Sequence, residues 1–135
     1  MGKHVLAILG GLVCGAIVIA IVQLISHTLY PLPDGLSIAD HEAMAEHIQH
    51  LPIGAFILVL ASWALGALVA GFVAARLDKP HGRVPAILSG VVLTLYGFLT
   101  LLFIEHPLWF WVAGLSLFVP MTYFGYHINK KLSTK

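Results

Sequence analysis

The chain has 135 residues, of which 59% are hydrophobic and only 10% are charged, and its mean hydropathy is +0.95. An average soluble domain carries about 25% charged residues, so the composition excludes an ordinary soluble domain and indicates an integral membrane protein. The net charge of +1 excludes nothing by itself, but the single cysteine, Cys14, excludes a disulfide within the chain and a cysteine-based zinc or redox site.

Four apolar segments are long enough to cross a bilayer, since a helix needs about 20 residues to span a hydrocarbon core of roughly 30 Å. These segments cover residues 5–29, 52–77, 84–104 and 107–127. Pro120 lies inside the fourth segment and predicts a kink there. The sequence therefore predicts an all-α fold, an integral membrane four-helix bundle that forms a single domain over residues 1–135.

The distribution of charge predicts the orientation of this bundle. All seven Lys and Arg residues lie near the two termini or beside the turn between the second and third spans. Five of the six acidic residues lie in the other two connections, and only Asp78 lies on the basic side. Because Lys and Arg are retained on the cytoplasmic side of a membrane, we expect both termini in the cytoplasm, most naturally of a cell inner (plasma) membrane.

Small residues recur every four positions in the first two spans, a pattern that lets helix backbones approach closely. The rows are Ala7, Gly11 and Gly15 in the first span, and Ser62, Gly66 and Ala70 beside Ala67, Gly71 and Ala75 in the second. One interpretation is packing of the four helices within the chain. The other is that the second row on the second span is a face for another copy of the chain or for another membrane subunit.

The connection between the first two spans, residues 30–51, is predicted to contain a short amphipathic helix over residues 37–50. Ser37 is placed to begin it, with Asp40 three residues later in the manner of a capping box. Apolar residues such as Met44 and Ile48 fall on one side at helical spacing, and carboxylates fall on the other. We expect this helix to lie on the outer membrane surface or to cap the bundle.

This outer helix also carries the residues that are the best candidates for a site. Glu46 and His50 are one turn apart, a spacing at which a carboxylate and an imidazole can chelate one divalent cation such as zinc or copper. The full set of candidate metal ligands is Glu46, His50, His47, Glu42, His27 and His106. Three other interpretations remain open at this point: a solvated helix, a cap that responds to pH, and a haem held between His27 and His106.

The centres of the spans contain no Asp, Glu, Lys, Arg or His, which argues against an ion-coupled transporter or a proton pump. Their Ser and Thr hydroxyls are expected to bond to backbone carbonyls one turn back. The sequence contains no phosphate-binding loop, nucleophile elbow or nucleic-acid-binding pattern, and no cofactor is predicted with confidence beyond the metal considered above.

In general appearance the chain is similar to the small four-span proteins of bacterial inner membranes. The sequence favours a non-enzymatic protein in the lipid bilayer, either a homo-oligomer or an accessory subunit of a membrane complex. A metal- or pH-responsive protein with a site at the outer face is one alternative. The others are an oligomeric channel or carrier for a small solute and an enzyme that acts on a lipid or a quinone.

Overall fold

A computed structural model describes all 135 residues and contains five helices and no strands. The helices are α1 (Gly2–Leu29), α2 (His41–Gln49), α3 (Ile53–Leu77), α4 (Arg83–Phe103) and α5 (Leu108–Ser133). All except α2 are long and apolar enough to cross a membrane. The shortest of these four, α4, has 21 residues, which at 1.5 Å per residue gives about 31 Å, the thickness of a hydrocarbon core. The all-helical architecture with four long apolar helices is confirmed.

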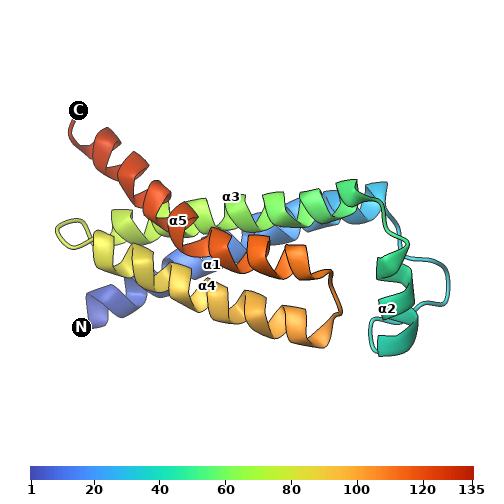
Figure 1. Cartoon of the computed structure of the whole chain (residues 1–135). Coiled ribbons are helices and arrows are strands. Elements are labelled where there is room, and N and C mark those ends of the chain that lie inside the picture. The colour runs from blue at the N-terminus through green and yellow to red at the C-terminus, as the bar shows by residue number, and fades with distance from the viewer.

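The four long helices run alongside one another, and α2 lies across one end of them (Figure 1). Both termini lie at the opposite end (Figure 1). Among the long helices α3 is the common neighbour, because it packs against α1, α4 and α5, whereas α1 contacts α4 much less extensively than it contacts α3.

Two long helices extend beyond the predicted spans. Helix α1 begins at Gly2, and α5 continues to Ser133, with Lys130 and Lys131 in its last turn. Cations are favourable at a helix C-terminus, so these lysines extend the helix past its apolar part. Pro120 lies inside α5, and Figure 1 shows the C-terminal part of α5 bending away from the other helices, as a proline inside a helix predicts.

The rows of small residues bring the helix backbones together within the chain. A Cβ atom on Gly11 would lie 2.5 Å from the carbonyl oxygen of Ala70, and one on Gly15 would lie 2.6 Å from that of Gly66. The first row of α3 therefore packs against α1. The second row packs elsewhere, since a Cβ atom on Gly71 would overlap the backbone of Thr122 in α5.

The second row was also considered as a face for a partner. In this structure its residues are covered by other helices of the same chain: Ala67 and Ala75 are fully or almost fully buried, with 0% and 1% of their surface exposed.

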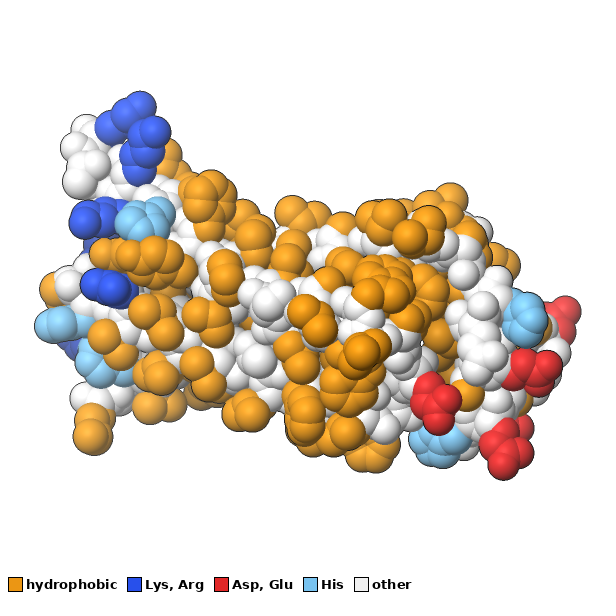
Figure 2. All heavy atoms as spheres, in the orientation of Figure 1, with side chains coloured by type: hydrophobic (Ala, Val, Ile, Leu, Met, Phe, Trp, Pro, Cys, Tyr) orange, Lys and Arg blue, Asp and Glu red, His pale blue; other side chains and the backbone are white.

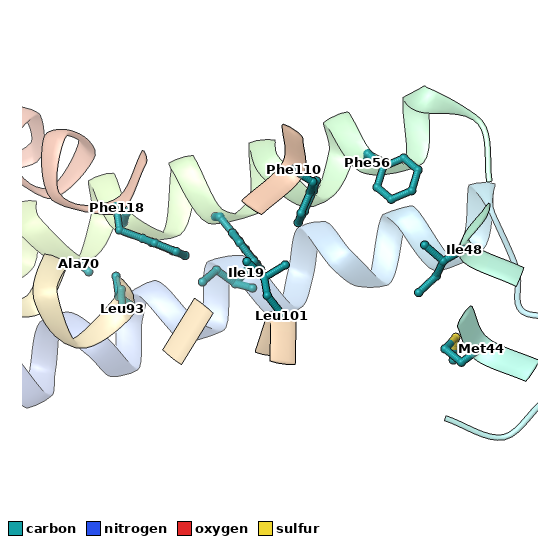
Figure 3. Packing of buried hydrophobic residues seen from close by; sticks show 11 residues of the cluster. Ile19, Met44, Ile48, Phe56, Ala70, Leu93, Leu101, Phe110 and Phe118 are labelled. Carbon is teal, nitrogen blue, oxygen red and sulfur yellow. The ribbon is translucent and has the colours of Figure 1, made fainter. Parts of the chain in front are cut away.

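Aromatic side chains fill the space between α3 and α5. The ring of Trp63 lies 5.5 Å from that of Phe110 and 5.1 Å from that of Phe118, measured between centroids. Figure 3 shows these phenylalanines in the row of buried residues that continues to Phe56 and then to Ile48 and Met44 of α2. Aromatic pairs at such separations add stability beyond the area that they bury. Because the row of buried residues continues to Ile48 and Met44, α2 lies over one end of a continuous core.

Several Ser and Thr hydroxyl groups within the long helices are bonded inside their own helices. Ser89 Oγ donates to the carbonyl oxygen of Pro85 at 2.8 Å, and Thr94 Oγ1 donates to that of Gly90 at 2.8 Å. Ser62 and Thr100 make bonds of the same kind. The predicted bonding to backbone carbonyls one turn back is confirmed for these side chains. Their hydroxyl hydrogens are therefore not available to bond to water or a solute in a polar passage.

Candidate functional site

Helix α2 begins at His41, four residues later than predicted. Its N-cap is Asp40, whose side chain accepts a hydrogen bond from the backbone N–H of Ala43. Ser37 Oγ accepts from the N–H of Ala39 instead and closes a local turn before the helix. Both residues are good acceptors for exposed N–H groups, and the structure uses Ser37 for the turn and Asp40 for the helix.

The apolar side of α2 packs on the end of the bundle, so α2 caps the bundle, which is one of the two positions predicted for it. Met44 and Ile48 are buried, with 8% and 7% of their surface exposed, and Figure 3 shows both at the end of the core row. A polar contact adds to this seating, because His41 Nδ1 lies 3.1 Å from the carbonyl oxygen of Phe103 at the end of α4. Helix α2 is thus held to the bundle by its buried face and by a bond at its first residue.

A cavity of about 310 Å³ lies beneath α2. Its walls come from the ends of α1, α3 and α4, from α2 itself, and from the loop that joins α4 to α5. Eleven of its 17 lining residues are hydrophobic, and none is Lys, Arg, Asp or Glu. Ligand cavities in proteins occupy about 300 to 1,000 Å³ and are mostly apolar with a few polar groups, so this space has the size and the composition of a small binding site.

Three of the six predicted site residues, His27, His47 and His106, line this cavity. His106 is the most constrained of them. Its Nδ1–H donates to the carbonyl oxygen of Ile104 at 2.6 Å, and its ring stacks on Phe110 with the centroids 4.7 Å apart. Burial lowers the pKa of His106 below its ordinary value of 6.5, and the bond to Ile104 offsets part of this shift. The ring is therefore neutral near pH 7, with Nε2 as an acceptor.

The other three predicted residues lie on the outside of α2. Glu42 and Glu46 are exposed and share a surface with Glu105. The His50 ring does not reach the Glu46 carboxylate, because its Nδ1–H donates to the backbone oxygen of Glu46 at 2.8 Å. The predicted set is thus divided between the two sides of α2. Nowhere in the chain do three or more His, Cys, Asp or Glu side chains gather closely enough to hold a metal ion.

Several cavity residues were not among the predicted site residues. Gln23, Ser26 and Tyr30 line the cavity from α1 and its C-cap, and Thr100 and Trp63 line it from α4 and α3. The α1 residues carry a signal in the sequence. Gln23, His27 and Tyr30 recur at helical spacing and form one polar stripe at the end of an otherwise apolar span. Such a stripe indicates a polar surface inside a bundle.

Comparison with protein-family models, with curated proteins and with solved structures finds no match to this chain. The assignment of a function therefore depends on the chemistry and geometry of the chain's own residues.

Proposed function

We propose that the chain is a four-span protein of a cell inner (plasma) membrane, with both termini in the cytoplasm, and that it acts as a non-enzymatic subunit of a membrane assembly. The partner is either a second copy of the chain or another membrane subunit. Two sets of observations support this proposal: the segregation of charge between the ends of the bundle, and an exposed tyrosine on the apolar surface of α4.

The charge pattern supports insertion in a single orientation. Figure 2 shows Lys and Arg side chains at the end that carries both termini, Asp and Glu at the α2 end, and hydrophobic side chains over the region between them. Only 31 of the 135 residues are buried, and many large apolar side chains of the long helices are exposed, above all on α1 and α4. A belt of this kind requires lipid as its solvent, and the basic end belongs on the cytoplasmic side.

The exposure of Tyr96 on the apolar surface of α4 is the observation that supports the proposed assembly. It lies on α4 with 55% of its surface exposed, seven residues before the end of the helix at Phe103, which is about 10 Å along the axis. Helical side chains lean toward the helix N-terminus, so its hydroxyl is directed further into the apolar belt. A hydroxyl that faces hydrocarbon without a partner costs about 2 to 7 kcal/mol. A neighbouring polypeptide that bonds to this hydroxyl removes that cost.

The test is photo-crosslinking in native membranes, with p-benzoylphenylalanine in place of Tyr96. A second copy would give a product of twice the 14.6 kDa mass of the chain, and another subunit would give a product of different mass. The matched control carries the same group at Ile17, which is 54% exposed on α1. Crosslinking at position 96 but not at position 17 is the expected result. A protein that stays monomeric after irradiation, and that is also a monomer in mild detergent, would contradict the assembly.

The alternatives predicted from the sequence have less support. A channel needs polar groups along a passage, whereas the hydroxyls of Ser89, Thr94 and Thr100 donate to their own helices. A metal-responsive site needs several converging ligands, whereas the candidates are divided between the two sides of α2. The cavity beneath α2 suits a different kind of ligand.

A further inference from the structure

The cavity beneath α2 lacks any charged group that could pair with a charged ligand. The lining side chains that carry a hydrogen-bonding hydroxyl, amide or imidazole group are Gln23, Ser26, His27, Tyr30, His47, Thr100 and His106. A buried phosphate or carboxylate is stable only when cations and hydrogen-bond donors compensate it, and a buried amine requires an acidic partner. The cavity offers neither a fixed cation nor a carboxylate, so its chemistry selects a neutral molecule.

The hydrogen-bonding groups of the cavity come from different walls. His106, in the loop between α4 and α5, presents an acceptor nitrogen, because its Nδ1–H is already bonded to Ile104. Tyr30 and Gln23, on the α1 side, have side chains that make no hydrogen bond within the chain, and they offer donors. A ligand ring with an oxygen atom on each of two opposite sides matches this placement of hydrogen-bonding groups on two walls.

Aromatic and aliphatic side chains form the rest of the lining. Phe56 and Trp63 line the cavity from α3, and the stacked pair of His106 and Phe110 lies beside Phe56. A volume of about 310 Å³ is at the small end for a ligand site, so it holds a ring but not a long chain. Helices α1 and α4 both line the cavity and contact each other less extensively than α1 and α3 do, so the boundary between them is the side on which we place an attached apolar tail.

We propose that this cavity binds the ring of a lipid-soluble quinone or quinol, with the ring oxygens between Tyr30 on one side and His106 on the other and the tail directed between α1 and α4. The proposal concerns binding alone and includes no electron transfer. All the walls belong to one chain, so the proposal does not depend on the assembly inferred from Tyr96.

The test uses the full chain in mild detergent with a short-tailed ubiquinone as the probe. Trp109→Phe and Trp111→Phe leave Trp63 as the only tryptophan, so its fluorescence reports on the cavity. Saturable quenching by the ubiquinone is expected. Tyr30→Phe removes the hydroxyl donor, and His106→Gln removes the ring nitrogen from the position at which it accepts, so each should weaken binding about fivefold to tenfold. His50→Gln, on the exposed side of α2, should leave binding unchanged.

A further variant keeps the test decisive if His106→Gln does not fold. Val59→Phe places a larger apolar side chain in the cavity wall and should abolish saturable quenching while helix content is retained. Quenching that does not saturate, or that is the same in Tyr30→Phe and Val59→Phe as in the parent protein, would overturn the proposal. So would competition by laurate as strong as that by the quinone, which would show a general site for acyl chains, or binding of Zn²⁺ with no binding of the quinone.

Discussion

Single glycines set how closely the helices of this bundle approach one another. Gly71 of α3 is the clearest case, because a Cβ atom there would overlap the backbone of Thr122 in α5, and a backbone cannot move aside as a side chain can. The contact lies two residues after Pro120, the proline inside α5. The position of α5 against α3 therefore depends on the absence of a side chain at one residue.

We predict that Gly71→Ala lowers the stability of the protein by about 1 to 3 kcal/mol, the usual cost of overpacking a close contact. The measurement is the free energy of unfolding in mild detergent. Gly10→Ala is the matched control, because the new Cβ atom would meet only the terminal methyl group of Leu77, whose exposed side chain can move. Equal effects of the two substitutions would contradict the close approach of α3 and α5.

His106 gives the α2 end of the bundle a pH dependence of known sign. Burial lowers its pKa from 6.5, so the unfolded chain binds the proton more readily than the folded chain. The folded state is fully stabilised above about pH 6.5 and loses stability as the pH falls below this value toward the lowered pKa. His27 and His47 across the cavity and the neighbouring Glu105 are the other titratable groups around it.

We therefore expect the thermal midpoint of the protein to fall between about pH 7 and pH 5, and to fall less in His106→Gln. His50→Gln should behave as the parent protein does, because His50 is exposed. A midpoint whose dependence on pH is the same with and without His106 would show that the ring is not buried as described.

At the scale of elements, α2 is the part of the fold that creates the cavity. It has only nine residues, too few for a stable isolated helix in water. It depends on the burial of Met44 and Ile48, on the contact of His41 with Phe103, and on its N-cap. Because α2 covers the cavity, its stability sets how easily the cavity opens.

We predict that Asp40→Ala destabilises α2 by about 1 kcal/mol, as the loss of a helix N-cap usually does. Hydrogen exchange of the α2 amides should rise accordingly, while exchange in the long helices stays unchanged. Ser37→Ala is the control, since Ser37 bonds to Ala39 before the helix begins, and it should have a smaller effect. A larger effect of Ser37→Ala would place the start of the helix where the sequence alone suggested.

The sequence predicts the long helices well because each has a run of apolar residues of the length that a bilayer requires. It does not predict the start of α2, because Ser37 and Asp40 are both able to cap a helix and only the position of the turn decides between them. His27, His47 and His106, three of the candidate ligands, line one cavity. They come from α1, α2 and the loop after α4, so their meeting depends on how distant segments pack, which no local pattern encodes.

At the scale of the whole molecule, the two ends of the bundle differ in charge. The only acidic residue at the basic end, Asp78, is removed from the surface, since it is 5% exposed and bonded to His4. The exposed charge at that end is therefore almost entirely positive. The opposite end carries the carboxylates of α2 and the loops (Figure 2). This asymmetry is the physical basis for the single orientation that we propose.

The most direct test of the account is the accessibility of the two ends of the bundle from outside the cell. Cys14→Ala removes the only cysteine of the chain. In that background, two separate variants, Asp34→Cys and Lys135→Cys, each place one thiol at one end of the bundle. A membrane-impermeant maleimide should label Asp34→Cys in intact spheroplasts, and should label Lys135→Cys only after the membrane is permeabilised. Labelling of Lys135→Cys in intact spheroplasts, or of both variants equally, would contradict four spans with both termini inside.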